Sequence, residues 1–223
     1  MAARWCSRVW QVAIVVAATG ASTRAALADD LRIAERFEVP PPPDEAEPWW
    51  ELELGALAVA PIERSAVCPA GRDCVMNAGI GLGLRFMRRQ PDRVGWGFAY
   101  DLWVLDSASL YEIALLHALR GQVRYVLDET SRVQPWIGAG VGALLFGDAS
   151  RVATGGGLLS GGLGAHFEIT SDFALLGSAE AWLFAMAPFS TRDATPRGEP
   201  FGVNVVLEVM VGAVVRIGAL ERD

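Results

Sequence analysis

The sequence predicts an all-β protein: a closed antiparallel, up-and-down transmembrane β-barrel of about eight strands. Three observations predict this fold. Although 52% of the 223 residues are apolar, no uncharged apolar run reaches the roughly 18 residues that a membrane helix needs. From Trp49 onward, apolar residues alternate with small or polar ones, which is the period of strands that have two different environments. The connections between these segments are alternately long and short, as in transmembrane barrels.

The N-terminal segment predicts export. Arg4 and Arg8 give a basic start, an apolar segment follows at 9–20, and small residues flank a leucine at 26–28, as at a cleavage site. A buried helix is the alternative, but it explains neither the basic start nor the acidic stretch that comes next. We therefore interpret residues 1–28 as a signal peptide.

Residues 29–48 are acidic and rich in proline, so they cannot build a core and favour an extended conformation. We expect them to form a periplasmic tail or linker. Removal of residues 1–28 would take away three arginines and no acidic residue, leaving 26 acidic side chains against 16 basic ones. Such a balance repels phosphates and excludes nucleic acid as a partner.

Two cysteines remain after the signal peptide, which contains Cys6. Cys68 and Cys74 lie six positions apart in a polar loop. An exported chain meets an oxidising compartment, so we expect a disulfide between them. A metal site is the alternative, but two thiols with no nearby histidine are too few ligands. We expect no cofactor and no metal.

The barrel is expected at 49–218, followed by a short tail at 219–223. The alternating segments are 49–58, 77–86, 95–104, 112–125, 137–143, 162–169, 173–186 and 203–217. Loops are expected at 60–75, 105–110, 147–157 and 187–201. Short turns are expected at 88–94, 128–132 and 170–172. Short turns face the periplasm in transmembrane barrels of this type, which places the loops outside the cell.

The second segment shows how the two faces of a strand differ. Leu82, Leu84 and Phe86 alternate with Gly81, Gly83 and Arg85, and the next segments repeat the pattern. Because backbone groups in hydrocarbon must all be paired, strands there have to close into a barrel. The apolar parity would face lipid, whereas a soluble barrel would place it inside.

The polar parity carries charges of both signs, which we expect to pair in the lumen because an unpaired buried charge is costly. Contact with lumen water is the alternative. The predicted lumen charge network comprises Glu51, Glu53, Arg85, Asp101, Glu112, Arg120, Arg124, Glu168, Glu180, Glu208 and Arg216.

Five aromatic residues of the apolar parity lie beside the predicted short turns. These are Trp50, Phe86, Trp96, Tyr125 and Phe167. Aromatic rings favour the headgroup zone, so we expect a periplasmic aromatic girdle. His117 falls on the lipid parity, eight residues from Tyr125, and is expected toward the outer headgroups.

Two stretches carry a family resemblance. Residues 133–142 (VQPWIGAGVG) resemble a recurring strand of the eight-stranded outer-membrane β-barrel superfamily of OmpA-like and OmpW-like transmembrane domains. The hairpin at 162–175, followed by Glu180, does so too. The resemblance implies a monomeric barrel in outer-membrane lipid, delivered by the outer-membrane assembly machinery. Such barrels usually end on an aromatic residue, whereas this chain ends GALERD at 218–223.

The function expected first is a structural or interaction role, with extracellular or periplasmic partners. A narrow pore or carrier for small solutes is the alternative, because glycines on the lumen parity could leave a passage. We do not expect an enzyme: only His117 and His166 could act as a histidine base, and neither pattern supplies a nucleophile. The glycines at 155–157 lack a following lysine and lie in a predicted loop, so they are no phosphate site. A soluble exported barrel of the lipocalin kind completes the alternatives.

Overall fold

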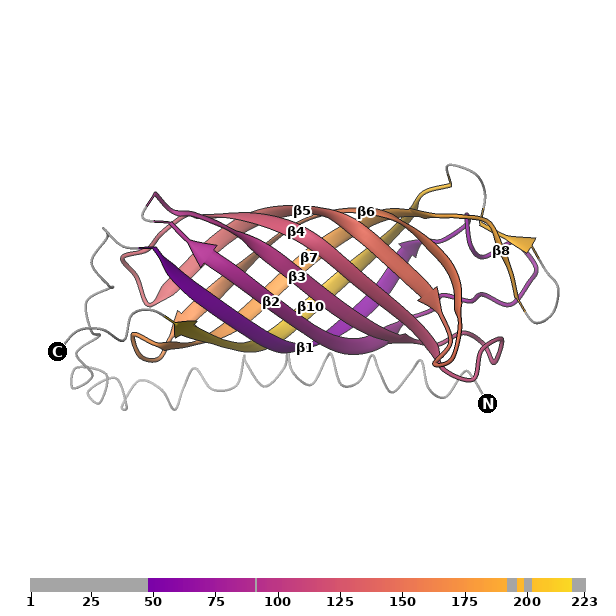
Figure 1. Cartoon of the computed structure of the whole chain (residues 1–223), viewed down its shortest axis with the longest axis horizontal. Coiled ribbons are helices and arrows are strands. Elements are labelled where there is room, and N and C mark those ends of the chain that lie inside the picture. Colours follow the sequence, from indigo (N-terminus) through magenta and orange to yellow (C-terminus); the bar gives the residue numbers. More distant parts are fainter. Residues whose placement is uncertain (1–47, 91, 192–195, 199–201, 218–223) are drawn as a thin grey trace, which may run out of the picture. The chain divides into compact units, whose positions relative to one another are not determined.

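A computed structural model describes residues 48–90, 92–191, 196–198 and 202–217. In it, eight antiparallel strands form a closed barrel in the order β1-β10-β7-β6-β5-β4-β3-β2 (Figure 1). The barrel strands are β1 (Trp49–Glu63), β2 (Gly79–Arg89), β3 (Val94–Leu105), β4 (Ala114–Val126), β5 (Val133–Gly147), β6 (Val152–Glu168), β7 (Phe173–Met186) and β10 (Asn204–Ile217). A small hairpin joins β8 (Phe189–Ser190) to β9 (Pro196–Arg197). The predicted fold is confirmed.

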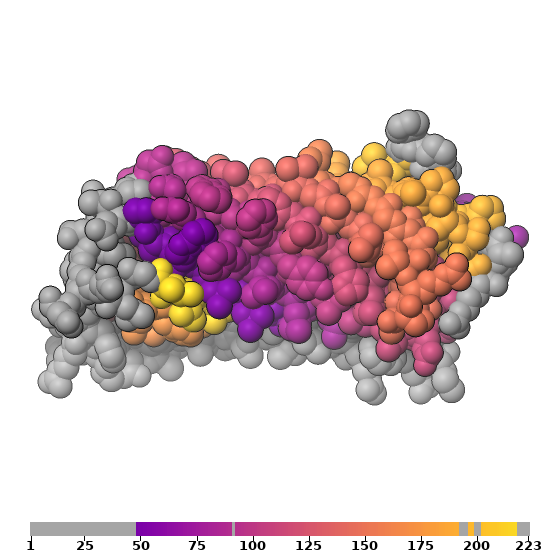
Figure 2. Space-filling view, viewed as in Figure 1, coloured from indigo at the N-terminus to yellow at the C-terminus, as the bar shows by residue number. Residues whose placement is uncertain are grey.

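The first and last strands close the barrel. β1 pairs with β10 from Trp50↔Ile217 to Glu63↔Val205, and its other edge pairs with β2. In Figure 2 the two chain-end strands, indigo and yellow, lie side by side, and side chains make a continuous surface over the wall in this view. Because every barrel strand has two neighbours, the barrel leaves no open sheet edge. No helix among the described residues is long and apolar enough to cross a membrane.

Connections sort to the two ends as predicted, with one correction. The connections that follow β1 (64–78), β3 (106–113), β5 (148–151) and β7 (described at 187–191, 196–198 and 202–203) leave one end, which we call the loop end. The connections that follow β2 (described at 90 and 92–93), β4 (127–132) and β6 (169–172) leave the other, the turn end. The loop predicted at 147–157 is wrong, because β6 already begins at Val152. Its glycines continue the strand: a Cβ on Gly156 would lie 1.9 Å from the carbonyl oxygen of Ala185, so β6 needs glycine there to approach β7.

The apolar parity faces outward. Leu82, Phe98 and Val209 are 58%, 62% and 45% exposed, although they lie in the middle of their strands. A soluble barrel would bury such side chains inside. The exposed wall is therefore apolar along the strands, which is the arrangement of a barrel that lies in lipid.

The lumen has two different halves. Toward the loop end, apolar side chains fill it, and the rings of Trp103 and Trp182 lie 4.7 Å apart between centroids. The apolar lumen residues in this half are Leu57, Val59, Trp103, Leu105, Leu116, Leu144, Phe146, Leu158, Trp182, Phe184, Met186 and Val206. Toward the middle and the turn end, buried charged side chains are interleaved with apolar ones such as Trp136, Leu176 and Val214. This division of the lumen into an apolar half and a mixed, charge-bearing half was not predicted.

A cap covers the loop end. In the β1–β2 loop, the predicted disulfide between Cys68 and Cys74 is present, with Cα atoms 4.7 Å apart, and Val67 is fully buried. The hairpin binds this loop, since the Arg197 guanidinium donates to the carbonyl oxygen of Asp73 at 2.7 Å. The ring of Phe189 then packs on Phe146 of the lumen at 5.8 Å. The cap and the apolar half of the lumen therefore form one continuous core.

The two predicted terminal segments, 1–28 and 219–223, lie outside the described residues, and of the predicted tail at 29–48 only Pro48 is described.

Candidate functional site

The middle of the lumen holds a compact ion cluster. Arg85 reaches from β2 to two carboxylates, with Nη2 2.9 Å from Glu180 Oε1 and 3.1 Å from Glu208 Oε1. Arg120 of β4 donates to Glu180 and lies 3.2 Å from Asp101. All five side chains are buried, so each charge depends on the others for its neutralisation.

Aromatic rings cover the side of this cluster that faces the loop end. The indole nitrogen of Trp103 donates to Glu208 at 3.0 Å. The guanidinium of Arg120 lies 4.4 Å from the ring centre of Trp182, a cation–π contact. The apolar half of the lumen therefore packs directly on the ion cluster.

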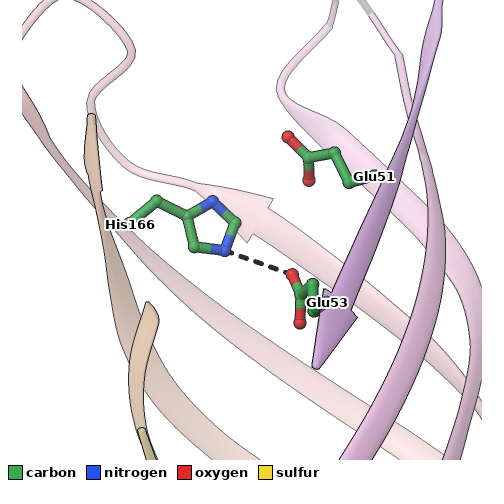
Figure 3. Close-up of side chains that lie close together, drawn as sticks. All are labelled: Glu51, Glu53 and His166. Carbon is green, nitrogen blue, oxygen red and sulfur yellow. Dashed lines mark ion pairs between the residues drawn. The ribbon is translucent and has the colours of Figure 1, made fainter. Parts of the chain in front are cut away.

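A second cluster lies nearer the turn end, and we call Glu51, Glu53 and His166 the cross-lumen triad (Figure 3). Glu51 and Glu53 are neighbours on the inward face of β1, whereas His166 reaches them from β6, which is not adjacent to β1. His166 Nε2 lies 3.2 Å from Glu53 Oε1. The three residues are 2%, 0% and 1% exposed, so the triad is closed to solvent.

Two arginines hold the carboxylates of the triad. Both terminal nitrogens of Arg124 donate to the Glu53 carboxylate, Nη2 to Oε2 at 2.8 Å. Arg216 Nε donates to Glu51 at 3.3 Å and its Nη1 to Glu168 at 2.8 Å. These bonds fix the orientation of the carboxylates, so the triad is a preorganised arrangement rather than a set of free side chains.

One predicted member of the lumen charge network does not belong to it. Glu112 lies exposed in the 106–113 connection, because β4 begins only at Ala114, and the prediction for Glu112 is wrong. The structure places the other predicted members on the inward face, either in the ion cluster of the middle lumen or around the triad.

The five residues of the predicted girdle point outward near the turn end. Trp50 stacks on Phe86 with ring centroids 4.5 Å apart and meets Trp96 edge-on at 6.4 Å. Tyr125 and Phe167 lie near the ends of β4 and β6 and are likewise exposed. The structure thus gathers three of these rings into one patch over β1, β2 and β3.

His117 also points outward, and one of its ring nitrogens has a partner within the wall. Its Nδ1 lies 2.7 Å from the hydroxyl of Tyr100 on β3. Its Cα pairs with Leu102 and Leu145, close to the loop-end limits of β3 and β5. His117 therefore lies toward the loop end of the wall, where Tyr100 supplies one hydrogen bond.

Comparison with known proteins finds likeness in structure only. Neither protein-family models nor curated proteins match the sequence. Among solved structures, Neisserial surface protein A is similar with a TM-score of 0.53 at 13% identity, over 75% of this chain and 97% of that one. The outer membrane protein OprG from Pseudomonas aeruginosa is similar with a TM-score of 0.50 at 14% identity, over 77% and 96%.

The chain has the eight-stranded barrel fold of outer-membrane proteins. At these identities the likeness concerns the fold and not the role of any residue. The contents of this eight-stranded barrel must therefore be interpreted from its own side chains.

Sequence reasoning placed the triad residues on the lumen face but did not bring them together. The alternation of the sequence could assign all three to the lumen, since Glu51, Glu53 and His166 fall on the polar parity. It could not predict that they meet, because β1 and β6 are not paired in the sheet. The cap and the apolar half were missed for the same reason.

Proposed function

We propose that this chain is an outer-membrane barrel with a sealed lumen and a structural or interaction role, presenting its capped loop end to the exterior. The observation that carries the proposal is the filled lumen. The apolar half, the ion cluster and the triad follow one another from the loop end to the turn end, and their side chains are buried. An eight-stranded barrel is just wide enough for side chains to fill it.

The exposed apolar wall supports placement in lipid. Leu82 and Phe98 would otherwise face water, which is unfavourable by about 25 cal/mol per Å² of apolar surface. The outward rings of Trp50, Phe86 and Trp96 suit the headgroup zone at the turn end. The proposal includes export through the segment 1–28, insertion by the outer-membrane assembly machinery, and a monomeric state.

The capped end supports a role outside the cell. The disulfide of the β1–β2 loop and the bond from Arg197 to Asp73 hold the cap in a single arrangement. A fixed loop surface can bind a partner without a large ordering cost. Arg72 lies exposed in this loop and offers a trypsin site. Trypsin treatment of intact cells should cut at Arg72; protection until the cells are lysed would contradict the proposed orientation.

A pore is the second candidate, and the filled lumen disfavours it. The mature chain, reconstituted in planar bilayers, should show no stepwise conductance, with protection of the strands from protease as the control for insertion. Steady conductance steps from inserted wild-type protein would overturn the sealed lumen and favour the pore. A non-enzymatic role fits as well, because His166 is buried against Glu53 and no substrate can reach it.

A further inference from the structure

We propose that Glu51, Glu53 and His166 bind one divalent transition-metal cation, which fastens β1 to β6 across the lumen. The sequence predicted no metal site, and the proposal is independent of the proposed function, since a sealed barrel can form with or without a cation. One ligand atom from each residue lies within 4.8 Å of the other two (Figure 3). Small side-chain shifts would bring them to the spacing set by the roughly 2.0–2.2 Å bonds of one ion.

The decisive observation is the state of His166. Its side chain is 1% exposed and points across the lumen at the two carboxylates, with Nε2 beside Glu53, yet neither ring nitrogen makes a hydrogen bond to any of the described residues. A buried polar group without a hydrogen bond costs about 1–3 kcal/mol. Binding of a cation through Nε2 would remove this cost for that nitrogen, which already lies 3.2 Å from Glu53 Oε1.

The donor set selects the kind of cation. One imidazole nitrogen and two carboxylate oxygens match the ligands of catalytic-type zinc sites, which use three protein ligands and leave one position open. Calcium and magnesium need about six or more oxygen ligands, and the triad has too few. The triad contains no thiolate, which disfavours copper in its lower oxidation state. Zinc is therefore the appropriate probe.

The surrounding groups suit a bound cation. Glu53 accepts from Arg124, and Glu51 accepts from Trp49 Nε1 at 3.1 Å and from Arg216 at 3.3 Å. A carboxylate has about four acceptor positions, so these bonds leave room for a metal and orient its ligands. Four carboxylates face three guanidiniums here, with Glu168 and the Arg89–Glu129 pair included, which leaves one negative charge for a cation to neutralise.

A proton is the competing occupant. An imidazolium at His166 would form an ion pair with Glu53 and would neutralise the same excess charge. The two readings differ in a measurable way. A metal requires His166 to bind through an unprotonated nitrogen, whereas an imidazolium carries a proton on both nitrogens.

The test folds the full mature chain into lipid with either Zn²⁺ or a chelator, because the buried triad has to be loaded as the barrel closes. After removal of free metal, the zinc-folded barrel should retain about one Zn²⁺ per chain and should unfold at higher urea concentration than the chelator-folded barrel. His166→Ala should lose the zinc and the shift in the urea midpoint. His117→Ala changes the other histidine, outside the triad, and should keep both.

A second measurement covers the case in which the His166 variants fail to fold. Wild-type barrel folded with Co²⁺ should show the visible absorption of a cobalt ion with nitrogen and oxygen ligands. Zinc missing from folded wild-type barrel, equal zinc in wild-type and His166→Ala, or a wild-type His166 ring that carries protons on both nitrogens would overturn the proposal in favour of the proton. A wild-type barrel without a cobalt spectrum would overturn it too.

Discussion

Glu180 and Glu208 are paired directly opposite each other on β7 and β10, both facing the lumen. Two like charges in such positions destabilise a sheet. Here one guanidinium group bridges them, because Arg85 Nη2 lies 2.9 Å from Glu180 and 3.1 Å from Glu208. Arg85 comes from β2, so it ties together strands on different sides of the barrel. Arg120 also pairs with both carboxylates, so two guanidiniums make the adjacent acidic side chains compatible with a closed barrel.

Arg85→Met should destabilise the barrel by about 3–5 kcal/mol, because it breaks a buried ion pair and leaves the neighbouring carboxylates of Glu180 and Glu208, together with Asp101, to Arg120 alone among the ion-cluster residues. Equilibrium unfolding by urea in lipid vesicles measures the change. Arg72→Met is the matched control in the exposed loop and should stay within about 0.5 kcal/mol. Adding Glu208→Gln to Arg85→Met should recover part of the loss. If the double variant is no more stable than Arg85→Met, the two carboxylates do not repel each other as argued.

An arginine introduced on the lipid-facing wall should destabilise the barrel more at the middle of the wall than near its ends. Leu82→Arg lies mid-strand and should make folding into vesicles less favourable by about 2–4 kcal/mol, since the charge would enter hydrocarbon. Ile62→Arg lies near the loop end of β1 and should cost about 0–1 kcal/mol. Both side chains are well exposed, at 58% and 65%, so a water-soluble barrel would tolerate them equally. Equal costs would thus contradict placement in lipid.

Tryptophans on the two faces should respond differently to lipid quenchers. Trp50 and Trp96 point outward at the turn end, whereas Trp136 is buried inside the barrel. In single-tryptophan variants, lipids brominated near the headgroup should quench Trp50 and Trp96 strongly and Trp136 weakly. Lipids brominated near the chain ends should quench Trp50 and Trp96 less, because the girdle lies at the interface. Strong quenching of Trp136 alone would invert the assignment of the two faces.

Loss of the cap disulfide should loosen the cap without opening the lumen. In Cys68→Ser/Cys74→Ser, trypsin should cut at Arg72 faster than in the wild type, because the loop loses its covalent closure. Conductance in planar bilayers should stay absent, since Trp103, Trp182 and the ion cluster still fill the lumen. The single variant Ser65→Ala in the same loop is the control for an unchanged rate. Channel steps in the double variant would show that the cap alone seals the barrel.

The sequence by itself determined the barrel and its two faces. Side chains of a strand alternate between the two faces of the sheet with period two. The sequence alone therefore assigns Leu82 and Arg85 to opposite faces, without knowledge of which strands lie beside theirs. Short turns and the cysteine pair are local too, and both were predicted correctly. The sequence failed where glycines hid a strand, as at Gly156, because a glycine-rich run carries no apolar alternation. It failed for Glu112 because parity does not say where a strand begins.

Only the tertiary structure decided which inward side chains meet. Arg85 contacts Glu180 and Glu208 across strands that are not paired with its own. His166 likewise contacts Glu53 from a strand that is not paired with β1. Such contacts depend on the strand stagger and tilt that close the barrel, and these are collective properties of all eight strands. Periodicity assigns a residue to a face, but its height along the barrel and its opposite wall follow only from closure.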